Sequence, residues 1–323
     1  MTQAIVVHEY GGPEQLRVES IEVGEPGHGA VRIRHTGIGV NYVDTYFRRG
    51  LYPAVLPYII GDQACGVVEA LGPGVESLAV GDRVAYGSCA NAYVEARLIP
   101  AELLVRIPDD VDETVVAASL TRGMTAEYLL FRLHALARGE TCVVYAAAGG
   151  TGRIVCQWAK HLGATVIATV GAAEKVAVAR EAGADHVLLN DDPDFVARVR
   201  GWNGGRGVDV VYDSVGRDTF AQSLECLRPR GLMVAYGNAS GPPEPLDVLA
   251  LARHGSLFLT RPRLPEYVAT RAELELCAGR YFDALASGTV RPHDTERYAL
   301  ADAAAAHVHL EDRARLTMPV LVP

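Results

Sequence analysis

The stretch from residue 142 to residue 175 constrains the fold of this chain more than any other part of its sequence. A short apolar run at 142–146 ends in small residues and glycines, and an amphipathic segment and a β-branched run at 165–170 follow. This succession predicts strand, tight turn, helix and strand, because short apolar runs suit buried strands and glycines suit turns. The chain therefore contains a strand-helix-strand unit typical of a parallel sheet.

The turn in this unit has the spacing of a dinucleotide-binding fingerprint, with Ala147 in the place of the first glycine and Gly149 and Gly152 after it. Small residues there permit a sharp turn, close approach of the backbone to a pyrophosphate, and close packing of helix on strand. The glycine pattern is weak evidence alone, but the predicted strand before it and helix after it make it specific. We therefore predict a dinucleotide site at this turn.

The residues after the second strand indicate which dinucleotide binds. A site for NAD usually has an acidic residue about 20 positions after the glycines, where it binds the ribose 2′-hydroxyl. This chain has Gly171 there, and Lys175 follows. Because no carboxylate repels a 2′-phosphate and an ammonium attracts it, the sequence favours NADPH. The alternative is that Lys175, which with Lys160 makes up all the lysines of the chain, is a solvated residue on the next helix.

Charge and cysteine content exclude several classes of function. A formal net charge of −9 without any basic run argues against a nucleic-acid partner, and the pair Arg48-Arg49 is interpreted as a solvated face or a local anion contact. No secretion signal is evident, and no apolar run approaches the roughly 18 residues of a membrane span, so we expect a cytoplasmic protein without a membrane partner. The cysteines are widely spaced, which predicts buried thiols rather than disulfides or a zinc knuckle.

Patterns along the chain predict an α/β protein with a β-rich part followed by a doubly wound parallel sheet. A short helix is expected at 41–49, and two more at about 112–120 and 125–136. A helix at about 265–287, a polar segment, a helix at 300–310 and an apolar run at 318–322 are expected to return to the first part. The predicted strands lie at 4–7, 31–35, 66–71, 83–86 and 93–99, and then at 142–146, 165–170, 186–189, 208–212, 232–236 and 256–259.

Motifs spread over nearly the whole length carry a resemblance to a known family. They read Gly39-Val-Asn-Tyr-Val-Asp-Thr-Tyr46, Gly50-Leu-Tyr-Pro53, Ala146-Ala-Ala-Gly-Gly-Thr-Gly152, Val211-Tyr-Asp-Ser-Val-Gly-Arg-Asp218 and Gly231-Leu-Met-Val-Ala-Tyr-Gly-Asn238. With these motifs the chain resembles the zinc-free quinone oxidoreductases of the medium-chain dehydrogenase/reductase superfamily, the group that includes zeta-crystallin. The resemblance implies a GroES-like catalytic domain at 1–122 and 262–323, and a Rossmann NADPH-binding domain at 123–261.

The resemblance also implies that no metal takes part. Zinc-dependent relatives have Cys at the position of Asn41, Gly-His-Glu at 61–63, and a four-cysteine lobe near Cys89. Here Asn41 and Gln63 supply neither thiolate nor imidazole, Asp62 stands in the histidine's place, and one cysteine remains at the lobe.

Site residues follow from the same resemblance. Asn41, Tyr46 and Tyr52 are implied as the catalytic residues of the nicotinamide side and the substrate cleft. The chain departs from the family at two of the cofactor positions. Asn190 stands where relatives often have a tyrosine, and it offers a hydrogen-bond donor but no aromatic ring. Thr151 stands where relatives usually have a valine. The implied NADPH-binding residues are Asn41, Asp44, Thr45, Thr125, Tyr128, Gly149, Gly150, Thr151, Gly152, Gly171, Lys175, Asn190, Val215, Gly237, Asn238, Ala239, Gly241, Arg261, Arg263 and Arg313.

The activity expected from the resemblance is hydride transfer from NADPH to a quinone or a similar conjugated carbonyl. Such acceptors need little acid-base chemistry, so the protein mainly positions the reactants, and Tyr46 or Tyr52 either contacts a flat acceptor or simply packs the wall. One alternative is an enoyl or alkene reductase, which needs a positioned proton donor, and another is a non-catalytic NADPH-binding protein. The resemblance also implies that residues 255–260 form the edge strand of the cofactor-domain sheet, and the apolar character of this edge predicts a homodimer.

Overall fold

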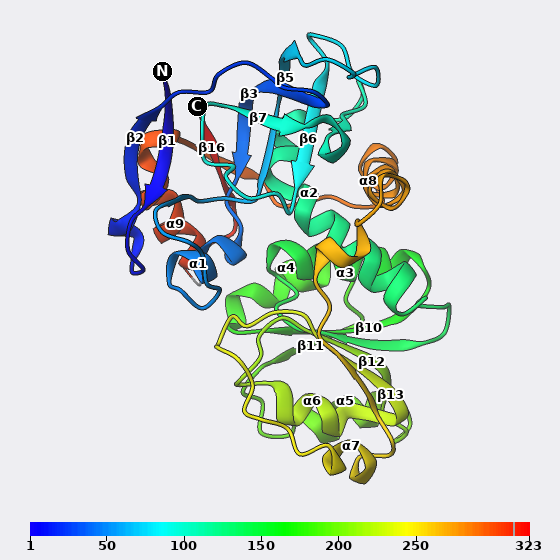
Figure 1. Ribbon diagram of the computed structural model, residues 1–323. Coiled ribbons are helices and arrows are strands. Elements are labelled where there is room, and N and C mark those ends of the chain that lie inside the picture. Colours follow the sequence, from blue (N-terminus) through cyan, green and yellow to red (C-terminus); the bar gives the residue numbers. More distant parts are fainter. Residues whose placement is uncertain (313) are drawn as a thin grey trace. The chain divides into compact units, whose positions relative to one another are not determined.

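The computed structural model of the protein describes residues 1–312 and 314–323, which form two compact units (Figure 1). The first unit comprises Met1–Met124, Val268–Ala286 and Pro292–Pro323. The second unit comprises Thr125–Tyr267 and Ser287–Arg291. The domain boundaries expected from the resemblance, at residues 122 and 262, stay a prediction.

The first unit is built on two β-sheets, with strand orders β2-β1-β4 and β15-β16-β3-β5-β6-β8, and β7 also pairs with β3. The last strand of the chain pairs antiparallel with β3, with Leu321 opposite Ile38, so the C-terminal apolar run completes this sheet. The strands are β1 (Thr2–Val7), β2 (Arg17–Ile21), β3 (Ala30–Gly39), β4 (Tyr58–Ile59), β5 (Gln63–Leu71), β6 (Arg83–Gly87), β7 (Ala96–Pro100), β8 (Val105–Arg106), β15 (Thr295–Ala299) and β16 (Met318–Val322).

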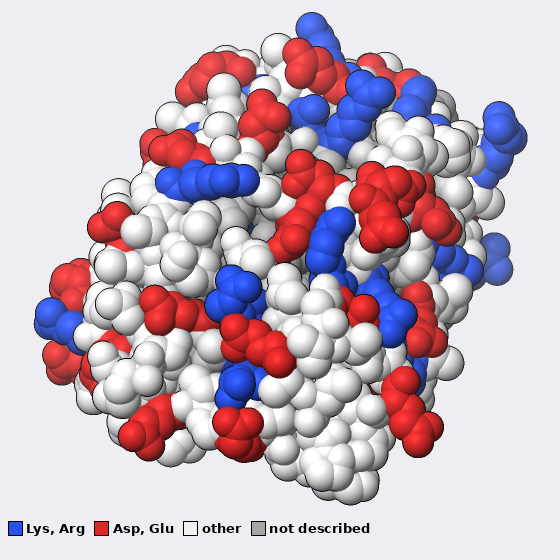
Figure 2. All heavy atoms as spheres, turned by 90° about the horizontal axis from the view of Figure 1, so that it is seen from above, with Lys and Arg blue, Asp and Glu red and all other residues white. Residues whose placement is uncertain are grey.

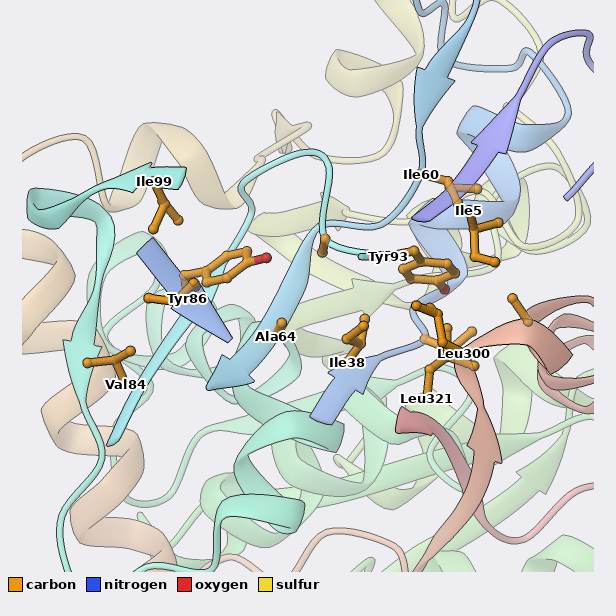
Figure 3. Close-up of a cluster of buried hydrophobic side chains, with 14 of the residues drawn as sticks. Ile5, Ile38, Ile60, Ala64, Val84, Tyr86, Tyr93, Ile99, Leu300 and Leu321 are labelled. Carbon is orange, nitrogen blue, oxygen red and sulfur yellow. The ribbon is translucent and has the colours of Figure 1, made fainter. Parts of the chain in front are cut away.

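Helices and a continuous apolar core complete the first unit. Figure 3 shows Ile5, Ile60 and Tyr93 of the early strands and loops in one cluster with Leu300 and Leu321 from the end of the chain. Because this core joins segments from both ends of the sequence, the C-terminal residues stabilise the N-terminal sheets. The helices are α1 (Tyr42–Arg48), α2 (Glu113–Glu127, which ends in the second unit), α8 (Arg271–Ala286) and α9 (Ala303–Glu311).

The second unit confirms the predicted doubly wound sheet. Its strands pair in parallel in the order β11-β10-β9-β12-β13-β14, and α3 and α4 lie on one face while α5 and α6 lie on the other (Figure 1). The strand order reverses between β9 and β12, which is where such sheets bind ligands at the carboxyl edge. The elements are β9 (Thr141–Val144), α3 (Gly150–His161), β10 (Thr165–Val170), α4 (Val176–Glu181), β11 (His186–Leu189), α5 (Phe195–Trp202), β12 (Val208–Asp213), α6 (Phe220–Cys226), β13 (Leu227–Ala235), α7 (Leu249–Arg253) and β14 (Phe258–Thr260).

Two helix predictions were wrong in their limits. The helices expected at 112–120 and 125–136 are one, because α2 continues into a π-helical segment at Tyr128–Leu133. Gly123 does not end the helix but allows close packing, since a Cβ there would lie 2.3 Å from the ring of Tyr281. The helix expected at 265–287 is divided into a 3₁₀ turn at Leu264–Tyr267 and α8.

The strand predictions missed the polar strands β2 and β15, and they placed the start of β7 too early and that of β13 too late. Of the helices in the described part of the chain, none combines the length and hydrophobicity that a bilayer-spanning segment requires.

Candidate active site

The turn between β9 and α3 has the geometry of a pyrophosphate cradle. The N–H of Gly149 donates to the carbonyl oxygen of Ala146 over 2.8 Å, and α3 begins at the next residue. A Cβ on Gly152 would lie 2.3 Å from that same carbonyl oxygen, so only glycine lets the first turn of α3 approach the end of β9. The first N–H groups of a helix have no partner within it, so this turn fits the pyrophosphate of a dinucleotide.

The other predicted residues of the second unit lie mostly in loops that follow the parallel strands. Parallel strands end at the same edge of a sheet, so these loops gather at the edge where α3 begins. Thr125 and Tyr128 instead belong to the helix that precedes β9, and the buried ring of Tyr128 stacks on Tyr267 with 4.3 Å between ring centroids. The predicted residues are Gly149 and, in the first turn of α3, Gly150, Thr151 and Gly152 after β9, Gly171 and Lys175 after β10, Asn190 after β11, Val215 after β12, Gly237, Asn238, Ala239 and Gly241 after β13, and Arg261 and Arg263 after β14.

Asp213, which sequence analysis did not single out, anchors the loop after β12. Its buried carboxylate accepts hydrogen bonds from the N–H groups of Val215 (2.8 Å) and Gly216 (3.1 Å) and from the hydroxyls of Thr219 and Ser223. Burial raises the pKa of Asp213, while these hydrogen bonds oppose the rise. A carboxylate at the end of an apolar strand was the signal that could have found it, since a buried charge needs donors close by.

The corner formed after β10 and β11 brings Gly171 and Asn190 together. The side-chain nitrogen of Asn190 lies 3.9 Å from the point where a Cβ on Gly171 would stand, and the Asn190 N–H donates to Val170. The side-chain oxygen of Asn190 is enclosed without a hydrogen-bond partner. Lys175 lies half-buried at the end of the helical turn Ala173–Lys175, which follows β10 as Gly171 does.

In the first unit, Asn41 is held firmly at the N-terminus of α1. Its buried side-chain amide donates to the carboxylate of Asp62 over 3.1 Å and to the side-chain oxygen of Gln63 over 3.3 Å. Gln63 is itself fixed, because its oxygen also accepts from the N–H of Thr121 over 2.8 Å. The orientation of the Asn41 amide therefore follows from two consecutive acceptors at the start of β5.

Two carboxyl groups beside Asn41 have strongly altered titration. One oxygen of buried Asp44 accepts from the N–H of Asn41 (2.7 Å) and the hydroxyl of Tyr93 (3.0 Å), whereas its other oxygen is enclosed without a partner. Burial, and then the charge of Asp62, raise the pKa of Asp44 well above its usual range. Burial also raises the pKa of Asp62 to about 6, although the hydrogen bond from Asn41 and the charge of Arg122 oppose this.

The predicted tyrosines form an aromatic group on and after α1. Tyr46 contacts Tyr52 edge-on with 5.3 Å between centroids, and Tyr42 and Phe47 extend the group. Thr45 is buried and its hydroxyl donates to the Tyr42 carbonyl over 2.7 Å, so this hydroxyl is used within the helix. Predicted residue Arg313 lies outside the described residues.

Comparison with known proteins places the chain in a family. Residues 27–141 match the model of the alcohol dehydrogenase GroES-like domain, and residues 150–265 match that of the zinc-binding dehydrogenase. The chain is 43% identical to a quinone oxidoreductase of Salmonella typhimurium over 100% of both chains. The chain belongs to the zinc-free quinone oxidoreductases of the medium-chain dehydrogenase/reductase superfamily.

A further relative and a solved structure are similar to this quinone oxidoreductase family member over nearly their whole length. A 2-haloacrylate reductase of a Burkholderia species is 44% identical over 100% of this chain and 99% of that protein. The structure of Escherichia coli quinone oxidoreductase complexed with NADPH superimposes with a TM-score of 0.96 at 40% identity, covering 99% of this chain and 100% of that one.

At the positions where zinc-dependent relatives of the family have ligands, this chain has a hydrogen-bonded cluster of Asn41, Asp62 and Gln63. Within the described ranges, no three His, Cys, Asp or Glu side chains are grouped so that they could hold a metal ion. Figure 2 shows acidic and basic side chains interspersed over one face, without the broad basic area that a nucleic-acid backbone requires.

Proposed function

We propose that this protein is a cytoplasmic NADPH-dependent reductase that transfers a hydride to quinones or similar conjugated carbonyls without a metal. The observation that carries the proposal is the turn at Gly149–Gly152, in which a Cβ on Gly152 would clash with the backbone of Ala146. The proposal is also supported by relatives that match this chain over nearly its whole length. They include a quinone oxidoreductase and a quinone oxidoreductase structure complexed with NADPH. Thiols that form no disulfide support a reducing compartment.

Each unit has a separate task in this proposal. Bound NADPH supplies the hydride. The second unit holds it through the N-terminus of α3, the loops after β12 and β13, and the cation of Lys175 at the 2′-phosphate. The first unit supplies Asn41, which Asp62 and Gln63 orient, and the aromatic group of Tyr46 and Tyr52 for a flat acceptor.

A panel of acceptors tests the proposal. NADPH or NADH is combined with quinones, enones and enoyl thioesters, and oxidation is followed by the absorbance of the reduced nicotinamide. Rapid turnover of quinones with NADPH supports the proposal. The 2-haloacrylate reductase among the relatives favours alkene reduction as the second candidate, which preferential turnover of enones would support. NADPH binding without turnover of any acceptor would indicate the non-catalytic alternative.

Replacement of Lys175 by alanine tests the choice of cofactor. A charge-assisted contact of about 1.5–3 kcal/mol corresponds to roughly 10- to 150-fold in affinity, so the KM for NADPH should rise by that factor. The KM for NADH should change little, because NADH has no 2′-phosphate. The kcat should also change little, because the contact is equally strong in the ground and transition states.

The matched control for this variant is Lys160→Ala. Lys160 pairs with Asp185 over 2.5 Å near the end of α3, far along the helix from its N-terminal turn, and its removal should leave both Michaelis constants unchanged. Equal weakening of NADPH and NADH by Lys175→Ala would show that Lys175 does not recognise the phosphate.

We also propose that the protein is a homodimer joined through β14. This strand lies at the edge of its sheet and exposes 62% of Phe258 and 38% of Leu259, and an apolar edge favours pairing with a second copy. Sedimentation at micromolar concentration should give twice the 34.5 kDa chain mass, and Phe258→Lys should give the monomer. Val55→Lys, at an exposed residue of the first unit, is the control that should remain a dimer. A monomeric wild-type protein would contradict this prediction.

A further inference from the structure

The reaction proposed above requires a proton, and no residue has yet been assigned as its donor. Hydride addition to an electron-poor alkene or a quinone produces an anion, and the product is complete only when this anion takes up a proton. Quinol anions accept a proton readily from water, whereas protonation of carbanions formed from alkenes is accelerated much more by a general acid held close to the carbon. A proton donor in the first unit would therefore decide how broad a range of acceptors the protein reduces. This inference rests on the proposed function.

Asp62 has the surroundings that such a donor needs. Its carboxyl is hydrogen-bonded to the side-chain amide of Asn41 over 3.1 Å, and Asn41 is the residue expected at the nicotinamide side. Asp62 is half-buried, so it can exchange protons with water, whereas neighbouring Asp44 is 1% exposed. Accessibility thus separates two carboxyl groups that lie on either side of the same asparagine.

Charged and titratable groups of several elements face Asp62. They are Asp44 of α1, Arg122 of α2, Tyr86 of β6, and Cys89 and Tyr93 of the loop that follows β6. Arg122 is buried, donates to the carbonyl of Val40 over 2.7 Å, and keeps its positive charge at neutral pH because its pKa falls only to about 10. The Arg122 cation therefore stabilises the carboxylate that remains after proton transfer.

We propose that Asp62 is the proton donor of this site and protonates the acceptor after hydride transfer. The hydride brings an electron pair to one carbon of the acceptor, and the resulting anion forms a bond to the proton of Asp62. The O–H bond of Asp62 breaks, its electron pair stays on the carboxylate, and water then returns a proton to Asp62. NADPH is oxidised and the acceptor is reduced by two electrons, so no other reductant is needed.

The titration of Asp62 agrees with this role. Burial raises its pKa to about 6, and a general acid is most effective when its pKa lies near the pH of the reaction. The rival donors are the hydroxyls of Tyr46 and Tyr52. Removal of the Asp62 carboxyl should abolish a pH dependence near 6, and removal of a tyrosine hydroxyl should not, so the assignment is testable.

The test is Asp62→Asn, which keeps the size of the side chain and an oxygen that accepts from Asn41 but removes the acid. For an enone acceptor, wild-type kcat should fall as pH rises through about 6, and the variant should be roughly 100- to 10,000-fold slower without this pH dependence. For a quinone, whose anion water can protonate, the variant should lose less than about tenfold. Asp62→Glu should restore the pH dependence, which a merely structural role would not predict.

Matched controls separate this inference from the proposed function. Asp109→Asn makes the same change at an exposed residue of the first unit and should behave as wild type. Tyr52→Phe should retain the pH dependence near 6. An Asp62→Asn variant with wild-type enone turnover, or a wild-type protein that reduces quinones but no enone, would overturn the inference and leave the proposed function intact. A wild-type protein that reduces neither class would refute the proposed function itself.

Proton binding by Asp62 can also be measured without turnover. Because the pKa of Asp62 is about 6 in the folded protein and near 3.9 when unfolded, folding binds a proton between these values. The free energy of unfolding should therefore be highest below about pH 4 as far as Asp62 is concerned, and this contribution should be lost as pH rises through about 6. An infrared titration of protonated carboxyl groups should show one that disappears in Asp62→Asn. An unchanged titration would contradict the assignment.

Discussion

Replacement of Arg48 by methionine should destabilise the first unit by about 3–5 kcal/mol, because it removes the fully buried partner of the ion pair with Glu311 and leaves His307 and the carbonyl of Gly11 without their hydrogen-bond donor. The Arg48 side chain is 0% exposed and donates to both carboxylate oxygens of Glu311 over 3.1 and 2.9 Å. It also donates to Nδ1 of His307 over 2.8 Å and to the carbonyl of Gly11. One guanidinium thus joins α1, α9 and the loop after β1.

The loss should extend to the residues that Arg48 orients. Burial, and then the charge of Arg48, lower the pKa of His307 to about 3, so the ring is neutral and accepts at Nδ1. Its Nε2 then carries the proton and donates to the hydroxyl of Tyr93 over 3.1 Å, and Tyr93 donates to Asp44. Without Arg48, His307 loses the donor that fixes its protonated nitrogen, so the hydrogen bonds from His307 to Tyr93 and from Tyr93 to Asp44 become less ordered.

The neighbouring arginine provides a control on the same glutamate. Arg49 pairs with Glu311 but is 59% exposed, and such pairs contribute at most about 1 kcal/mol. In scanning calorimetry, Arg48→Met should lower the Tm of the first unit by roughly 6–20 °C, while Arg49→Met should lower it by less than about 4 °C. Equal effects of the two substitutions would show that the buried contacts of Arg48 do not carry the stability.

The sequence predicts the sheet of the second unit well because its inner strands are buried on both faces. The run at 186–189 agrees with β11, a mostly half-buried edge strand, and the runs at 165–170 and 208–212 agree with the inner strands β10 and β12 to within one residue. A strand of this kind is a nearly continuous apolar run, so its own composition identifies it. The missed strands β2 and β15 are mostly half-buried or exposed and polar, and only their partners β1 and β16 define them.

The polar network of the first unit could not be predicted from local pattern. The pair Arg48-Arg49 was interpreted as a solvated face or a local anion contact. Arg49 is 59% exposed, whereas Arg48 is buried and its carboxylate partner Glu311 is distant in sequence. The partner His307 lies 259 positions further along the chain, and no spacing rule connects residues so far apart. By contrast, the start of α8 carried a local signal, because Thr270 and Glu273 form a capping box of side-chain and backbone hydrogen bonds.

The capping box, which sequence analysis did not use, and the glycine turn, which it did use, share one property. In both, the constraint acts between residues a few positions apart, so the sequence alone contains the interacting partners. In the turn at Gly149–Gly152 the fingerprint spacing and the close backbone contact both require glycine at position 152. A substitution at this position therefore tests the cofactor site.

Replacement of Gly152 by alanine should weaken NADPH binding at least about 100-fold, equivalent to about 2.7 kcal/mol. The added Cβ would stand 2.3 Å from the carbonyl oxygen of Ala146 and 3.0 Å from the Cα of Ala147, and both are backbone atoms that no rotamer change can move. The first turn of α3 must then shift away from β9. Its N–H groups would move from the pyrophosphate that they are expected to bind, and Kd from a fluorescence titration of NADPH measures the loss.

Two further glycine substitutions grade this effect by distance. At Gly149 the nearest atom to an added Cβ is the Ala146 oxygen at 3.0 Å, so Gly149→Ala needs a smaller shift and should weaken binding less than Gly152→Ala. At Gly201 in α5 nothing lies within 4 Å, so Gly201→Ala should leave Kd unchanged and stabilise the helix by about 0.5–1 kcal/mol. Circular dichroism checks that each variant is folded. If folded Gly152→Ala bound NADPH as tightly as Gly201→Ala, close approach of α3 to β9 would not be what creates the cofactor site.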